Sequence, residues 1–262
     1  VPVDVVNYPV RLATPEPMEV EFSTENNFLV VSQWAARKNL DNTIRWFVEE
    51  FKDDETAGLV LKTNQSNDST PDRLVTGRRL EAMLANYPDR KCKVYLVHGQ
   101  ISQGELTWLY QHPTMKGLVN IGHGEGYGLP LFEAAYNGLP LVTVTWSGHM
   151  DFICKPNKKG KNFPRVCSVD YDLRPVQPEA VWDGVIQADS MWAFAREASY
   201  KRALRECLEK QGHYRQMAQG LQSHILENFT AEKMYEQFVA SIYNPSEEEV
   251  EWAQSLGEIE IL

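Results

Sequence analysis

Short apolar runs alternate with amphipathic stretches along the first 145 residues of the chain. The apolar runs are typical of buried parallel strands and comprise Phe28–Ser32, Gly58–Thr63, Lys93–His98, Gly117–Ile121 and Pro140–Thr145. Between the first two runs, Leu40, Ile44, Phe47, Val48 and Phe51 recur at the spacing of one helical face. Further helices are predicted over Asp72–Asn86, Glu105–Gln111 and Leu129–Asn137. This alternation predicts an α/β fold, a Rossmann-like doubly wound parallel sheet.

The two ends of the chain have other patterns. Residues 1–25 contain four prolines and little periodicity, so we expect a linker or crossing segment, and residues 26–228 are expected to form one domain. Within it, Lys155–Lys161 is a basic loop and Arg165–Leu173 a candidate strand. Helices are predicted over Trp192–Gln211, His213–Asn228 and Ala231–Tyr243, with Thr230 as the N-cap of the last. Residues 229–262 would be a closing helix and an acidic tail.

Composition narrows the class of protein. The 43% hydrophobic and 24% charged residues are ordinary for a globular chain, and no apolar run is long enough to span a bilayer. The net charge of −10 includes six acids in the last 18 residues, which leaves only −4 for the rest and argues against non-specific nucleic-acid binding. Four scattered cysteines without a C-x-x-C pair, and no signal peptide, favour a reducing, cytoplasmic location.

The richest loop follows the fourth predicted strand. Gly122–Gly128 reads GHGEGYG and runs directly into the helix expected at Leu129. Glycines let the backbone approach a ligand, and the N-terminus of the following helix adds partial positive charge, so the segment is a candidate phosphate site. A tight turn without a ligand is the competing interpretation.

The carboxylates of this segment point to hydroxyl groups. Glu125 and Glu133 are separated by seven residues, and both are expected to face the crevice at the carboxyl ends of the strands. A carboxylate repels phosphate but can accept hydrogen bonds from the vicinal hydroxyls of a ribose or hexose. Trp34 and Trp146, in neighbouring loops, are candidates for lining a sugar pocket.

These motifs resemble a known family. Glu125 and Glu133 at this spacing, the segment GEGYGLPLFEAAYNGLPLV and the later Gly148 resemble the donor-binding domain of retaining GT-B glycosyltransferases of the family 4 type. FLVVSQWAARKNLDNTIRWF, LVHGQISQGELTWLY and NFTAEKMYEQFVASIY resemble other segments of that family in the same order. The resemblance covers about residues 26–244. It implies that the chain is the C-terminal half of a GT-B fold, with a nucleotide-sugar-binding domain at residues 26–228.

The resemblance also implies roles for individual residues. Lys38 would contact the donor diphosphate, Glu125 the transferred sugar, and these two would be the catalytic residues. Glu133 would bind the ribose hydroxyls, and the backbone at Gln100 and Ile101 the edge of the base. The donor site would also include the loop residues Gly124, Gly126, Tyr127, Gly128 and Leu129. Gln33 stands where the family often has arginine, so Arg37 is the candidate replacement cation.

Metal and cofactor chemistry are not expected. Asp170 and Asp172 form a D-x-D, the metal–nucleotide signature of the other glycosyltransferase fold, but they lie away from the glycine loop. The sequence shows no metal-ligand spacing, and the resemblance implies that cationic side chains and the helix dipole stabilise the leaving group instead. We therefore predict no metal and no cofactor, with the nucleotide sugar as substrate.

The implied activity is transfer of a hexose from a UDP- or GDP-linked sugar to an acceptor hydroxyl, with retention. Only about 25 residues precede the first strand, so we expect a separate N-terminal acceptor domain, in cis or as another chain. Peripheral membrane attachment would arise through that domain, and an apolar last helix would drive weak self-association. The alternatives are a nucleotide-sugar epimerase or hydrolase, a binding-only nucleotide domain, and a dinucleotide-binding oxidoreductase. The oxidoreductase alternative is disfavoured because a dinucleotide-binding glycine motif follows the first strand, whereas Gly122–Gly128 follows a late strand.

Overall fold

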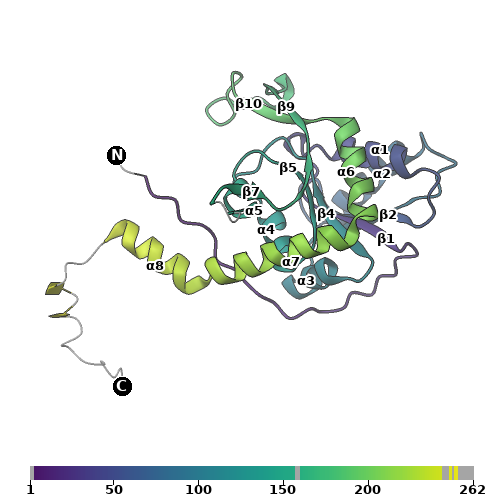
Figure 1. The fold of residues 1–262 in the computed structure, drawn as a ribbon. Helices are drawn as coiled ribbons and strands as arrows, with labels where there is room; N and C mark the ends of the chain where they lie inside the picture. The colour runs from purple at the N-terminus through teal and green to yellow at the C-terminus, as the bar shows by residue number, and fades with distance from the viewer. Residues whose placement is uncertain (1–2, 157–159, 244–247, 250, 253–262) are drawn as a thin grey trace.

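The computed structural model describes residues 3–156, 160–243, 248–249 and 251–252. Its centre is a six-stranded parallel sheet with the strand order β3-β2-β1-β4-β5-β8 (Figure 1). The strands are β1 (Asn26–Val31), β2 (Ala57–Thr63), β3 (Lys93–His98), β4 (Met115–Asn120), β5 (Leu141–Val144) and β8 (Cys167–Val169). The predicted fold class is confirmed, because every pairing in this sheet is parallel and helices cover it on both sides.

Strand β1 shows why the apolar runs become central strands. Phe28, Leu29 and Val30 are at most 3% exposed, so successive side chains are buried on both faces of the sheet. A strand that is covered on both faces needs no polar alternation. Pairing of β1 with β2 on one side and β4 on the other places their carboxyl ends at one edge, where the candidate loops begin.

Helices form a layer on each face. The helices are α1 (Leu40–Phe51), α2 (Thr70–Leu84), α3 (Gln103–Gln111), α4 (Leu129–Tyr136), α5 (Met150–Ile153), α6 (Glu197–Glu209), α7 (Gln211–Asn228) and α8 (Ala231–Ile242). One hydrophobic cluster joins α1, α2 and α6 to the sheet, with Phe47 and Leu204 wholly buried. A second cluster joins α3, α4, α5 and α7, with Phe132 and Ile225 at its centre. The amphipathic stripe predicted over Leu40–Phe51 is confirmed by α1.

The N-terminal segment and Met234 at the start of α8 pack against the second cluster. Residues 3–25 form no helix or strand, but the Val10 N–H donates to the Phe229 carbonyl at 2.8 Å, and Met18 and Phe22 pack against the second cluster. Thr230 caps α8 as predicted, because its hydroxyl accepts the N–H of Lys233. Figure 1 shows α8 extending from the end of α7 away from the sheet. Most of the predicted acidic tail lies outside the described residues.

Three predictions for the region after β5 are wrong. The first part of the predicted helix Trp192–Gln211 is strand β10 (Met191–Ala195), which pairs antiparallel with β9 (Tyr171–Pro175), and α6 begins only at Glu197. The predicted single strand Arg165–Leu173 divides between β8 of the main sheet and β9 of this hairpin. The apolar run at Trp192 adjoins a true helix, so only its pairing with a distant strand distinguishes it. The predicted basic loop Lys155–Lys161 begins too early, because Lys155 and Pro156 are in strand β6 (Cys154–Pro156), which pairs with β7 (Asn162–Pro164); residues 157–159 lie outside the described residues.

Candidate functional site

Three loops meet at the carboxyl edge of the sheet. The glycine-rich loop Gly122–Gly128 follows β4, the short 3₁₀ turn Ala36–Lys38 follows β1, and residues 145–149 follow β5. The Gly148 N–H donates to the Glu125 carbonyl at 3.0 Å. A Cβ on Gly148 would stand 1.7 Å from the Gly126 carbonyl oxygen, so only glycine permits this approach of two backbones. Gly128, at φ +87°, turns the chain into α4.

The glycine loop and the 3₁₀ turn are joined by an ion pair. Lys38 Nζ lies 2.7 Å from both carboxylate oxygens of Glu125. The Glu125 side chain is only 6% exposed and that of Lys38 18% exposed, so both charges are largely removed from water. Arg37 donates to the carbonyl of Gly124 and reaches Glu125 at 3.3 Å. Residues that were predicted from separate motifs are thus brought together in one place.

Asn120, the last residue of β4, completes the surroundings of Glu125. Its Nδ2 donates to Glu125 Oε1 at 3.0 Å, and its Oδ1 accepts the N–H of Gly122 at 3.0 Å. Burial raises the pKa of Glu125, but the charge of Lys38 and the hydrogen bonds from Asn120 and Lys38 outweigh it and hold the pKa below its usual value. Glu125 is therefore an anion at neutral pH.

Lys38 itself is affected by burial. Removal from water lowers the pKa of its ammonium group, and the neighbouring Glu125 offsets this effect only in part. An anionic ligand with several charges would stabilise the ammonium form further. Arg37 is 39% exposed beside it and supplies a second cation to the same edge.

Glu133 lies in a separate environment. It sits in α4, and its Oε2 accepts the hydroxyl of Tyr110 from α3 at 3.0 Å. Burial raises its pKa, while hydrogen bonds from Tyr110 and Gln103 and the charge of Lys62 act in the opposite direction. Within the described part of the chain, no contact joins Glu133 to Glu125; each belongs to its own network on either side of the glycine loop.

The remaining predicted residues surround these two carboxylates. Gly126 and Leu129 are exposed, and a side chain at Gly126 would meet open space. Gln33 is exposed, and its amide donates to the Gln65 carbonyl at 2.6 Å. Tyr127 is half-buried, with its ring 4.9 Å from that of Tyr8 in the N-terminal segment.

The predicted base-edge segment lies after β3. Gln100 is exposed and Ile101 half-buried. They lie between the end of β3 and α3, which Ser102 and Glu105 open with a reciprocal capping box. Because α3 carries the Tyr110 and Gln103 partners of Glu133, this segment and Glu133 belong to the same side of the site.

Sequence reasoning missed three residues of the site. Asn120 donates to the Glu125 carboxylate, Ser147 accepts the Glu125 N–H at 3.1 Å and donates to its carbonyl at 2.6 Å, and His123 in the glycine loop is only 2% exposed. Asn120 could have been found from the sequence, because it is a polar residue at the end of a buried strand, where ligand-binding loops begin. Ser147 and His123 carried no comparable signal.

Two other candidates have structural roles. Trp34 does not line a sugar pocket: it is 4% exposed, its Nε1 donates to Asp41, and Arg79 lies over its ring at 4.6 Å. Trp146 is half-buried and lies against Gly124, where a Cβ would stand 2.9 Å from its ring.

The carboxylates of the D-x-D segment are paired with arginines: Asp172 with Arg174 and Arg196, and Asp170 with Arg202.

The described residues contain no cluster of three or more His, Cys, Asp or Glu that could hold a metal ion. None of the helices in the described ranges is both long and apolar enough to cross a membrane. Both statements concern the described residues alone.

Known proteins resemble this chain in structure rather than in sequence. A scan against protein families finds no match, and no curated protein matches the sequence. S. aureus TarM, solved with fondaparinux, α-GlcNAc-glycerol and UDP, superposes with a TM-score of 0.59 at 15% identity, over 91% of this chain and 39% of TarM. Sucrose-phosphate synthase from Thermosynechococcus elongatus gives 0.53 at 18% identity, over 83% of this chain and 46% of that one.

A third similar structure is a single domain. The C-terminal domain of a glycosyl transferase group 1 family protein from Francisella tularensis gives a TM-score of 0.51 at 14% identity, over 86% of this chain and 97% of that domain. This chain therefore spans less than half of the two larger proteins and nearly all of the isolated domain. At these identities the likeness shows the fold, and the fold of this chain is the Rossmann-like α/β domain of GT-B glycosyltransferases.

Proposed function

We propose that this chain is the donor-binding domain of a retaining glycosyltransferase of the family 4 type, which transfers a hexose from a nucleotide sugar to an acceptor hydroxyl. The observation that carries the proposal is the buried Lys38–Glu125 pair at the carboxyl edge of β1 and β4. It lies beside the exposed Gly126 and the first turn of α4. A cation, a carboxylate and free backbone N–H groups are the groups that a sugar diphosphate needs.

The donor diphosphate belongs at Lys38. The first N–H groups of α4 have no carbonyl partner within the helix, and the helix dipole favours an anion there. When the bond between the anomeric carbon and the phosphate oxygen breaks, negative charge grows on the diphosphate, and Lys38, Arg37 and the helix N-terminus stabilise it. These groups take the place that a metal ion holds in other transferases.

The carboxylates bind the sugars. Glu125 stays ionised because of its partners, so it accepts hydrogen bonds from hydroxyls of the transferred hexose and supports the positive charge that develops on its ring. Glu133, on the α3 side, accepts the ribose hydroxyls, and the backbone at Gln100 and Ile101 meets the base. The acceptor oxygen attacks from the face that the diphosphate leaves, and its proton passes to the departing phosphate oxygen.

The acceptor side of the cleft is supplied by a second Rossmann-like domain. Support comes from α8, whose described side chains Tyr235, Phe238, Val239 and Ile242 are between 55% and 71% exposed. Exposed apolar side chains gathered in one helix support the proposal that a second domain covers it. The larger similar proteins are more than twice as long as the part that superposes on this chain, so the remainder of each is long enough for such a domain.

Calorimetric titration with UDP, GDP, ADP and NAD tests the proposal directly. A nucleoside diphosphate should bind and NAD should not. Binding of NAD together with indifference to nucleoside diphosphates would contradict it and would support an oxidoreductase. With the acceptor domain present, product analysis of a labelled donor distinguishes transfer from epimerisation or hydrolysis, and the anomeric configuration of the glycoside tests retention.

A further inference from the structure

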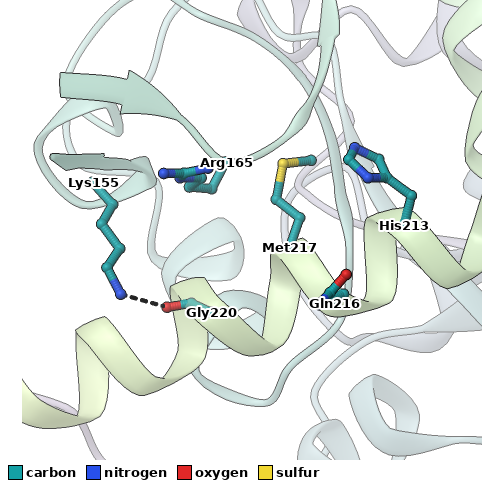
Figure 2. Close-up of a pocket in the computed structure, with 6 residues that line it drawn as sticks. All are labelled: Lys155, Arg165, His213, Gln216, Met217 and Gly220. Carbon is teal, nitrogen blue, oxygen red and sulfur yellow. Dashed lines mark hydrogen bonds between the residues drawn. The ribbon is translucent and has the colours of Figure 1, made fainter. Parts of the chain in front are cut away.

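A cavity outside the candidate donor site lies between helix α7 and the β6–β7 hairpin. Its volume is about 300 Å³, and it is lined by Lys155, Arg165, His213, Gln216, Met217 and Gly220. Figure 2 shows Lys155 and Arg165 on the hairpin side, facing residues of α7 across the opening. None of these residues belongs to the donor site proposed above.

Two cations of this cavity have no carboxylate partner among the described residues. Lys155 Nζ donates only a long hydrogen bond, 3.5 Å, to the Gly220 carbonyl, and Arg165 is fixed by its main-chain N–H, which donates to the Ile153 carbonyl at 2.9 Å. In the described ranges, no Asp or Glu oxygen comes within 4.0 Å of either cation. Elsewhere the protein pairs such groups, as Lys201 does with Glu49 and Arg205 with Glu50.

Arg165 also holds an unused donor. Its Nε is buried and has no hydrogen-bond acceptor among the described residues. A buried donor without an acceptor is destabilising, and the planar guanidinium group matches two oxygens of one anion. An anion in the cavity would accept this N–H and receive the charge of Lys155 at the same time.

The shape of the cavity limits the size of the ligand. Its volume lies at the lower end of the range for small-molecule sites. His213 and Gln216 offer polar groups, while the Met217 side chain is apolar and Gly220 has no side chain to fill the space. This combination suits a doubly charged head group on a small, partly polar carbon skeleton.

We propose that this cavity is a binding site for a small phosphate monoester, separate from the donor site. The phosphate is held between Arg165 and Lys155, and the esterified carbon skeleton lies along Met217 and Gly220. The site binds without a chemical step.

Titration with inorganic phosphate, glucose 6-phosphate and glucose at low ionic strength tests this site by calorimetry. We expect both phosphates to bind, glucose 6-phosphate more tightly, and glucose not to bind. The double variant Lys155→Gln/Arg165→Gln should weaken binding of both phosphates at least tenfold. Arg165→Lys, which keeps the charge but loses the planar fork, should give an intermediate loss, and it serves as the second variant should the double variant fold poorly.

Two controls separate this site from the alternatives. Arg78→Gln/Lys93→Gln removes the same charge from exposed positions and should leave binding unchanged, so an equal loss there would reduce the effect to bulk charge. The same phosphate titrations at saturating UDP should give unchanged affinities, so competition by UDP would place the phosphate in the donor site. Unchanged affinity in the folded double variant would overturn the proposal.

Discussion

His123 and Ala193 exchange hydrogen bonds between the glycine loop and strand β10. The Ala193 N–H donates to the His123 carbonyl at 3.0 Å, and His123 Nδ1 lies 2.8 Å from the Ala193 carbonyl oxygen. A carbonyl oxygen only accepts, so Nδ1 carries the proton. The ring also stacks on Trp192, with centroids 5.4 Å apart and planes 13° apart. The β9–β10 hairpin is therefore fastened to the loop that contains Glu125.

Replacing this imidazole should loosen the hairpin. His123→Phe keeps a ring against Trp192 but removes the Nδ1–H donor, so the free energy of unfolding should fall by about 1–2 kcal/mol. Urea denaturation measures this loss, and limited proteolysis should show faster cleavage between β9 and β10. Trp182→Phe, at a position in the connecting segment that is 66% exposed, is the matched control and should change neither. Equal stability of His123→Phe and the native protein would show that the pair does not anchor the hairpin.

The ionised state of Glu125 should appear in the acid stability of the protein. Its pKa is lowered in the fold from an ordinary value of 4.5, so its contribution is complete above that value and is lost as the pH falls through the lower folded pKa. The difference in unfolding free energy between native protein and Glu125→Gln should therefore shrink below about pH 4.5. Urea denaturation across that range measures it, with the exposed Glu81→Gln as control. A difference that stays constant with pH would mean that folding does not lower the pKa of Glu125.

Lys38 should distinguish a diphosphate from a nucleoside. Lys38→Ala should weaken UDP binding by tenfold or more, about 1.4 kcal/mol, and uridine binding much less, because only the diphosphate carries the charge it pairs with. Calorimetry with both ligands gives the two losses. Arg45→Ala, an exposed cation of the neighbouring helix α1, should leave both affinities unchanged. Equal losses for the two ligands would assign Lys38 a role in folding alone.

Glu133 should recognise ribose hydroxyls. Glu133→Ala should weaken UDP binding by about 1–3 kcal/mol, the cost of leaving hydroxyl groups without an acceptor. The loss should disappear for UDP that lacks both ribose hydroxyls, which makes the ligand pair the control. Tyr110→Phe removes the hydroxyl that now donates to Glu133 and tests whether that contact orients the carboxylate. Unchanged UDP binding in Glu133→Ala, at unchanged thermal stability, would contradict the assignment.

The chain by itself should bind donor without forming a glycoside. Orientation of two substrates supplies much of the rate in a bimolecular transfer, and half of a cleft does not orient an acceptor. An assay of residues 1–262 with several nucleotide sugars and a panel of hydroxyl acceptors measures this. Robust turnover would place the acceptor site within these residues.

The sheet and its carboxyl edge were predictable because their signals are local. The part of β1 from Phe28 to Val31 is apolar at every position, and the stripe of α1 repeats at helical spacing, so the sequence pattern predicts both elements. The family resemblance implied that Lys38 and Glu125 belong to one donor site, and the structure brings the two side chains together. Their roles toward a donor remain predictions.

The β9–β10 hairpin could not be predicted in the same way. Trp192 and Ala193 adjoin the true helix α6, and their pairing partners lie about 20 residues earlier in the chain. His123 is buried against this hairpin, which it contacts through Trp192 and Ala193. The missed strand and the missed histidine therefore have one cause, a tertiary contact that leaves no periodic pattern.

The close approach of Gly148 to Gly126 has a consequence for how the site responds to a ligand. With the Gly148 N–H bonded to the Glu125 carbonyl and no room for a single carbon between the two backbones, the glycine loop cannot move toward residues 147–149 without displacing them. Because Ser147 bonds both the N–H and the carbonyl of Glu125, the coupling reaches the residue proposed to touch the sugar. A donor that moves the glycine loop would thus reorient residues 147–149 as well. The two segments would then move together as one unit.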